Sequence, residues 1–187
     1  MKFEYQTDRL YLRILPSEYA HHIHEFYINN KTFLEPLEPK RPDNFYTLDF
    51  QKGNLNAEYQ AFLKLKHIRY WLFAKENGTI PIGSVCFSHI MQGAFKKCML
   101  GYKLAEDSCH HGFMTEALSF LVPETMHELG LHRVEAYVQP ENLSSVELLT
   151  RLHFKEEGYL SSFAEINGNW ADHLLFSYVE APAQYIF

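Results

Sequence analysis

Residues 109–118, CHHGFMTEAL, join a strand-like run to a helix-like run through a single glycine, Gly112. Before it, apolar residues alternate: Cys98, Leu100, Tyr102 and Leu104. After it, apolar residues recur at helical spacing: Met114, Ala117, Leu118 and Leu121. A strand that leads through a loop into a helix directs unpaired N–H groups and the positive end of the helix dipole at one point, so this order predicts a phosphate or pyrophosphate site. An ordinary strand-to-helix connection is the alternative, because one glycine is less than a dinucleotide fingerprint requires.

The remaining periodicity and turn residues predict a full set of elements around this turn. In order, we expect a strand over 7–15, a helix over 18–29, a surface loop over 33–46, a helix over 47–66, strands over 69–75, 80–91 and 97–104, the helix after Gly112, a strand over 133–138, a helix capped by Asn142, and strands over 159–166 and 170–179. Ser17 is placed to cap the first helix, and Gly53 predicts an imperfect or delayed start of the second. Asn77-Gly78 and Asn167-Gly168 are strong hairpin signals.

This order predicts an α+β fold with one mixed, mostly antiparallel sheet flanked by helices. A doubly wound dinucleotide-binding fold would instead alternate single strands and helices throughout. The length of 187 residues suits a single domain over residues 1–187. We leave open whether the protein is a monomer or a homodimer.

Composition limits where the protein works and what it binds. The formal charge of −6 argues against general nucleic-acid binding, which requires a basic face. The N-terminal sequence lacks a signal peptide and no run is long enough to span a membrane, so we expect no membrane association and a cytoplasmic protein. Three cysteines without a CxxC pair predict reduced thiols and no metal site.

Several motifs together resemble the GNAT N-acetyltransferases, and within them the RimJ/RimL-type enzymes that acetylate the N-terminal alanine of ribosomal proteins, RimJ more closely. The motifs are TDRLYLR, FLEPLEPKRP, HHGFMTEAL, HRVEAYVQPENLSSVELLTRLHF and INGNWADH, and the resemblance covers about residues 7–179. It implies the GNAT fold, acetyl-CoA as the acetyl donor, and transfer to an amine.

The resemblance also implies which residues bind acetyl-CoA. The backbone of Tyr102, Lys103 and Leu104 is expected to pair with the pantetheine amides, as an added strand pairs with a sheet edge. The pyrophosphate would lie on the turn formed by His110, His111, Gly112, Phe113, Met114 and Thr115. Asn142 and Ser145 would reach the pantetheine arm and the sulfur end.

The turn departs from the family pattern. Relatives have Gln-Gly-Lys-Gly where this chain has Cys109-His110-His111-Gly112, so a glycine and a permanent cation are lost. We expect His111 to supply positive charge only when a phosphate binds beside it; a solvent-exposed spacer is the alternative. Cys109, close to a helix N-terminus, is a candidate for a lowered thiol pKa and a mixed disulfide with CoA, although a buried or inert thiol is the preferred interpretation.

The catalytic groups are less fully specified. Many GNAT enzymes use a tyrosine to protonate the thiolate, but Leu149 stands at that position, so Ser145 is the candidate acid; its alternative role is to support the Asn142 cap. The base stays unassigned, because Ala164 stands where some Rim relatives have glutamate. His173, next to Asp172, is either an acceptor-side group or a structural one.

The leading hypothesis is therefore transfer of acetyl from acetyl-CoA to a protein N-terminus, of a ribosomal protein for example, by direct attack in a ternary complex. Part of an α-amine is already neutral near pH 7, because its pKa is about 7.7 to 8.0. Acetylation of a small-molecule amine is the enzymatic alternative, and a CoA-binding module with little catalytic activity is the non-enzymatic one.

Overall fold

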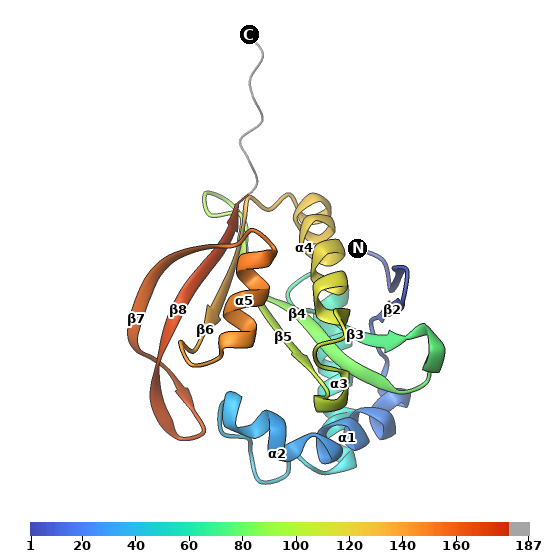
Figure 1. The fold of residues 1–187 in the computed structure, drawn as a ribbon. Coiled ribbons are helices and arrows are strands. Elements are labelled where there is room, and N and C mark those ends of the chain that lie inside the picture. Colours follow the sequence, from blue (N-terminus) through green and yellow to red (C-terminus); the bar gives the residue numbers. More distant parts are fainter. Residues whose placement is uncertain (180–187) are drawn as a thin grey trace.

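A computed structural model describes residues 1–179 and shows one eight-stranded sheet with helices on both faces (Figure 1). The strands are β1 (Glu4–Gln6), β2 (Leu10–Arg13), β3 (Ile68–Ala74), β4 (Pro81–Met91), β5 (Lys97–Leu104), β6 (Arg133–Val138), β7 (Lys155–Ile166) and β8 (Asn169–Val179). The helices are α1 (Ala20–Asn29), α2 (Lys31–Leu34), α3 (Leu48–Leu63), α4 (Phe113–Leu129) and α5 (Leu143–Arg151). The predicted α+β class and mixed sheet are confirmed.

The sheet order is β1-β2-β3-β4-β5-β6-β8-β7, and among the described strands only β5 and β6 run parallel. Their pairing extends from Lys97↔Arg133 to Leu100↔Ala136. Beyond that point β5 continues to Leu104 and β6 to Val138 without further pairs between them. The two strands therefore separate at their C-terminal ends, and each leaves backbone N–H and C=O groups unpaired on the side facing the other strand.

Both faces of the sheet are buried, which explains the continuous apolar runs of the central strands. On β3, Tyr70 and Leu72 pack into the cluster that includes α4 and α5, whereas Trp71 and Phe73 pack into a second cluster with α1, α2 and α3. Figure 1 shows α4 and α5 in front of the sheet and α3 behind it. The gap between the separated ends of β5 and β6 therefore lies between the helices that cover the two faces of the sheet.

Several local expectations at the start of the chain were wrong. Ser17 does not cap a helix: it begins a 3-10 turn (Ser17–Tyr19) that follows Pro16, and no side chain caps α1. The proline-rich segment is not loop throughout, because α2 and a 3-10 turn (Glu35–Leu37) occupy its first part. Pro36 fits there because the first turn of a helix needs no N–H at that position.

The second helix and the first hairpin also differ from expectation. Thr47 accepts a hydrogen bond from the Phe50 N–H and caps α3, which continues through Gly53 without interruption. A 3-10 turn (Lys75–Asn77) joins β3 to β4, so this connection is longer than the two-residue turn that Asn-Gly indicated. Strand β1 was missed because three residues carry too little periodicity to be recognised.

Replacing Gly53 with alanine is expected to raise the free energy of unfolding by about 0.5 to 1 kcal/mol, because glycine is unfavourable inside a helix. No atom lies within 4 Å of the position that the new Cβ would take. Urea denaturation measures the change. Gly83→Ala is the matched control of opposite sign, since its Cβ would lie 2.3 Å from the Lys103 carbonyl oxygen. An unchanged or lower stability of Gly53→Ala would contradict the prediction.

Candidate functional site

A cavity of about 650 Å³ lies where β5 and β6 separate. Two groups of residues line it. The first group, here called the helix side, comes from β5, from the turn before α4 and its first residues, and from α5 with its cap; it includes Tyr102, His110, Gly112, Met114, Thr115, Asn142, Ser144, Ser145, Glu147, Leu148 and Arg151. The second group, here called the loop side, comes from the segment around α2 and from β5, β6 and β8 and includes Phe33, Leu34, Leu37, Glu38, Lys103, Tyr137 and His173.

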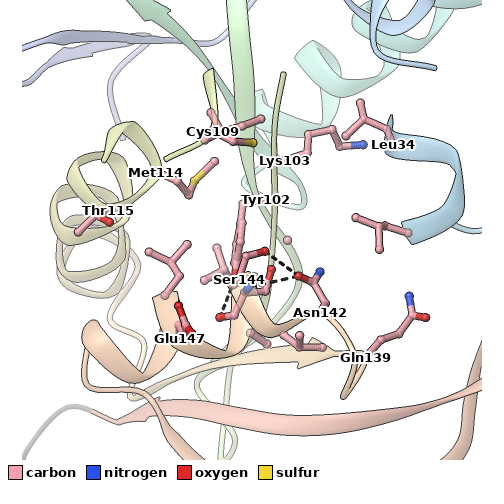
Figure 2. A pocket seen from close by; sticks show the side chains of 18 of the residues that line it. Leu34, Tyr102, Lys103, Cys109, Met114, Thr115, Gln139, Asn142, Ser144 and Glu147 are labelled. Atoms are coloured by element: carbon pink, nitrogen blue, oxygen red, sulfur yellow. Dashed lines mark hydrogen bonds between the residues drawn. The ribbon is translucent and has the colours of Figure 1, made fainter. Parts of the chain in front are cut away.

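The start of α5 is organised by Asn142, as predicted. Its Oδ1 accepts hydrogen bonds from the Ser145 N–H at 3.2 Å and from the Ser144 hydroxyl at 3.0 Å. The Tyr102 hydroxyl donates to the Ser145 carbonyl at 3.5 Å, and burial raises the pKa of Tyr102 to about 12. Figure 2 shows Tyr102, Asn142 and Ser144 close together beside the cavity, with dashed lines for hydrogen bonds. Two hydroxyl groups that stay protonated at neutral pH, those of Ser145 and Tyr102, therefore lie on the helix side.

The edge of β5 beside the cavity presents backbone groups as well as side chains. Tyr102, Lys103 and Leu104 pair with β4 on one side, and β6 has moved away on the other. Gly83 on β4 makes this close pairing possible, because any side chain there would strike the Lys103 carbonyl and Leu104. The free side of β5 is therefore an edge to which an extended ligand with amide groups can add.

The turn before α4 presents free N–H groups. Gly112 adopts the left-handed conformation at φ 77° and α4 begins at Phe113, with no side chain capping its first turn. His110, Gly112, Met114 and Thr115 line the cavity. His111 and Phe113 are outside the cavity lining, and their rings pack against each other at 6.0 Å. An uncapped helix start that faces a cavity suits an anion.

Thr7 and Arg9, in the turn between β1 and β2, form a charged clamp on the turn before α4, which the sequence reasoning missed. Arg9 donates to the His111 carbonyl at 2.9 Å and pairs with Glu116 of α4 at 2.6 Å. Thr7 and the Arg9 N–H also donate to Glu116. These bonds connect two sequence motifs, TDRLYLR and HHGFMTEAL. They also hold in place the backbone that faces the cavity.

His110 stands in the left-handed region at φ 64°, where the family pattern has glycine. We expect His110→Gly to raise the free energy of unfolding by about 1 kcal/mol, because the left-handed conformation is unfavourable for residues with a Cβ. Chemical denaturation measures the gain. His127→Gly, at an exposed position in α4, is the matched control and should lose about 1 kcal/mol. A loss of stability in His110→Gly would show that the histidine makes contacts that outweigh the strain.

The loop side is built around Glu38, which the sequence analysis did not single out. Its carboxylate pairs with Lys103 of β5 and with Arg41. Burial alone would raise the pKa of Glu38, but the two cations hold it below its usual range. The Glu38 carbonyl accepts from the Asn167 N–H at 3.0 Å, which ties the β7–β8 hairpin to the segment after α2. The two lie side by side in Figure 1.

The remaining candidates are divided between the cavity and the surface. Cys109 lines the cavity, but burial and then the charge of Glu106 raise the pKa of its thiol, so the lowered pKa considered for it is wrong. His173 lines the cavity and is buried. Asp172 lies outside the lining and bonds to Tyr159 and to the Ser162 N–H. In residues 1–179, no helix is long and apolar enough to cross a bilayer.

A family model described as "Acetyltransferase (GNAT) domain" matches residues 9–155. The chain belongs to the GNAT acetyltransferase family. It is therefore an acetyltransferase with acetyl-CoA as acetyl donor, and the GNAT fold accounts for the separation of β5 and β6.

Similar proteins and solved structures refine the place of this chain within the GNAT family. It is 31% identical over 174 residues, 93% of the chain and 89% of the relative, to a [ribosomal protein uS5]-alanine N-acetyltransferase of Escherichia coli. It is 33% identical over 144 residues, 77% of the chain and 79% of the relative, to a probable N-acetyltransferase, YjcK, of Bacillus subtilis. The structure of a ribosomal-protein-S5-alanine acetyltransferase from Vibrio fischeri superposes with a TM-score of 0.91 at 26% identity, covering 97% of this chain and 98% of that one.

The fold also matches that of RimJ from Mycobacterium smegmatis, solved in complex with CoA-disulfide, with a TM-score of 0.85 at 24% identity over 93% of this chain and 84% of that one. Together with the 31% identity to the Escherichia coli enzyme, the GNAT family match confirms the resemblance of this chain to RimJ/RimL-type enzymes. Its cavity fits acetyl-CoA, because the free edge of β5 and the uncapped start of α4 offer partners to the amides and to the pyrophosphate, respectively.

Proposed function

We propose that this GNAT enzyme acetylates the N-terminal α-amine of a protein, a ribosomal protein in particular. The observation that carries the proposal is the two-sided cavity. Its helix side suits acetyl-CoA, and its loop side offers an apolar wall, Phe33, Leu34 and Leu37, to a second substrate. Relatives that act on alanine N-termini of uS5 support the choice of acceptor. The place of action we propose is the cytoplasm, with residues 1–187 working as one domain.

The proposed binding roles follow the cavity lining. The backbone of Tyr102, Lys103 and Leu104 pairs with the pantetheine amides. The N–H groups between His110 and Thr115 hold the pyrophosphate, with His111 and Phe113 supporting the turn from behind through their contacts with each other and with Arg9. Asn142 and Ser145 face the arm and the sulfur end.

We propose direct transfer between the two substrates. Part of an N-terminal amine is neutral near pH 7, so it can attack without prior activation by a strong base. Ser145, held at the start of α5 beside the Tyr102 hydroxyl, donates a proton to the departing thiolate. A covalent step on Cys109 is disfavoured, because its thiol is held in the protonated form and donates to the Ala105 carbonyl.

Thiol release from acetyl-CoA tests the proposal over a panel of acceptors. We expect turnover on peptides that begin with alanine or serine, and little on the same peptides with a blocked N-terminus and an internal lysine. Turnover confined to polyamines or other small amines would replace the proposal with a small-molecule acetyltransferase. Binding of CoA without turnover on any amine would support a binding module. Size-exclusion chromatography distinguishes the monomer from the homodimer.

A further inference from the structure

His173 is a buried histidine of the loop side that the proposed chemistry does not yet use. It lies on β8, only 5% exposed, and lines the cavity together with Tyr137 of the neighbouring strand β6. Because Tyr137 pairs with Leu175, His173 and Tyr137 project from the same face of the sheet. Lys103 also projects toward this face and reaches Glu38. The imidazole is thus beside the space that the acceptor would occupy.

The hydrogen bonding of His173 determines which ring nitrogen can accept a proton. Its Nδ1 lies 3.0 Å from the Ala171 carbonyl oxygen. A carbonyl oxygen can only accept, so Nδ1 carries the hydrogen and Nε2 carries the lone pair in the neutral ring. The hydrogen bonds of residues 1–179 give Nε2 no partner, and the residue lines the cavity. A fixed tautomer with a free lone pair is what a general base requires.

The imidazole ring of His173 also packs against an aromatic side chain of β7. Phe163 of β7 packs on it at 5.5 Å and stacks on Tyr137 at 4.6 Å. A bulge between Leu160 and Ala164 brings Phe163 into this position. Asp172 maintains the bulge through the Ser162 N–H at 2.7 Å and the Tyr159 hydroxyl. The motif Asn-Gly-x-Trp-x-Asp-His therefore supplies both the histidine and the carboxylate that shapes its surroundings.

Two carboxylates near this face, those of Glu38 and Glu135, are already paired with cations. Glu38 is paired with Lys103 and Arg41. Glu135 of β6 accepts from Lys97 at 3.0 Å, from Arg133 at 2.7 Å and from the Tyr137 hydroxyl at 2.9 Å. Cations and donors around a carboxylate stabilise its charged form and make it a weak proton acceptor. His173 is the group on this side whose basic atom is left free.

We propose that Nε2 of His173 accepts the proton released by the acceptor amine during acetyl transfer. The inference rests on the proposed function. In the step, the amine nitrogen bonds to the acetyl carbon, and the carbon–sulfur bond breaks with its electron pair passing to sulfur. The ammonium proton passes to His173 while sulfur takes the proton of Ser145. His173 then releases its proton to solvent and Ser145 regains one from solvent, so the enzyme returns to its starting state.

Two variants separate this role from support of the fold. In His173→Asn the amide nitrogen can keep the bond to the Ala171 carbonyl that Nδ1 makes, but Nε2 is lost. His173→Ala removes the whole ring and leaves space for free imidazole. We expect either change to lower kcat about 100-fold, within the range typical of a general base, with the KM for acetyl-CoA unchanged. Added imidazole should restore His173→Ala at least about tenfold. His127→Ala, exposed on α4, is the matched control and should behave as wild type with and without imidazole.

The outcomes distinguish this inference from the proposed function. Absence of wild-type turnover on every amine overturns the proposed function and the inference with it. Normal wild-type turnover, with His173→Asn within about threefold of it, overturns the inference alone. Loss of activity in both variants without rescue of His173→Ala by imidazole also overturns it, because a structural histidine is not replaced by a free base in solution. If His173→Ala does not fold, the kcat of His173→Asn decides.

Discussion

Replacing Arg69 with methionine lowers the free energy of unfolding by about 3 kcal/mol or more. Arg69 of β3 donates to Glu58 of α3 at 2.8 Å and to the Ser84 hydroxyl at 3.2 Å. The side chains of Arg69 and Glu58 are 17% and 15% exposed. Removing one partner of such a pair leaves the other charge buried without compensation, which typically costs about 3 to 5 kcal/mol. Within residues 1–179, His67, 3.7 Å from Glu58, is then the one cation paired with the carboxylate.

The pH dependence identifies the cause of this loss. Burial alone would raise the pKa of Glu58, but Arg69 and His67 lower it to about 2. A carboxyl with a depressed pKa stabilises the fold above its unfolded value, about 4.3, and this contribution disappears as the pH falls from there to about 2. The difference between wild type and Arg69→Met should therefore be full at pH 7 and shrink below pH 4.

Denaturant titrations at several pH values make this measurement. Lys31→Met is the matched control, because its pair with Glu35 at 4.0 Å is half exposed and should contribute well under 1 kcal/mol. The double change Glu58→Leu with Arg69→Met should recover much of the loss, since it removes both buried charges. A loss below about 1 kcal/mol in the single variant, independent of pH, would contradict the prediction.

Replacing Ser145 with alanine lowers kcat by about 100-fold, the effect expected of a lost proton donor. The side chain lines the cavity, whereas only the backbone N–H and C=O of Ser145 make the bonds that the structure shows, to Asn142 and to Tyr102. The helix cap therefore survives the substitution. The KM for acetyl-CoA should change little, because the donor acts on the sulfur as it leaves and not on the bound arm.

Two further variants complete this test, and the kcat of each is measured by steady-state kinetics on a peptide that begins with alanine. Thr150→Ala is the matched control: its hydroxyl, exposed on α5 and outside the cavity lining, donates to the Val146 carbonyl and should be dispensable for catalysis. Tyr102→Phe examines the competing donor, whose pKa of about 12 keeps it protonated. If Ser145→Ala stays within about threefold of wild type while Tyr102→Phe loses activity, Tyr102 is the proton donor and the role given to Ser145 is wrong.

The sequence predicted the elements of the fold wherever periodicity and turn residues agreed. The alternation from Cys98 to Leu104, the cap at Asn142 and the Asn167-Gly168 hairpin are all found in the structure. The prediction that Ser17 caps the first helix was wrong because a local preference for capping does not determine where helical hydrogen bonding starts. Here the chain makes a 3-10 turn before the helix. The prediction of an irregular start at Gly53 was wrong because the packing of α3 outweighs the low helix propensity of glycine.

The candidate site was predicted less completely than the fold. The cavity lining includes most of the residues implied by the family resemblance, but not His111 or Phe113. Glu38 and Arg9 were missed because their partners, Lys103 and Glu116, lie 65 and 107 residues away in the chain. Contacts of that span depend on the sheet order, and no spacing or motif in a single sequence reveals them.

The free edge of β5 makes the cofactor part of the thermodynamics of folding. From Gly101 to Leu104 the side of β5 that faces β6 pairs with no strand among residues 1–179, and these are the backbone groups proposed above for the ligand. A ligand that binds only the folded chain adds about 2.7 kcal/mol to the unfolding free energy when its free concentration is 100 times its dissociation constant. Free CoA has the same pantetheine amides and pyrophosphate as acetyl-CoA, so either form would stabilise the folded protein through this edge.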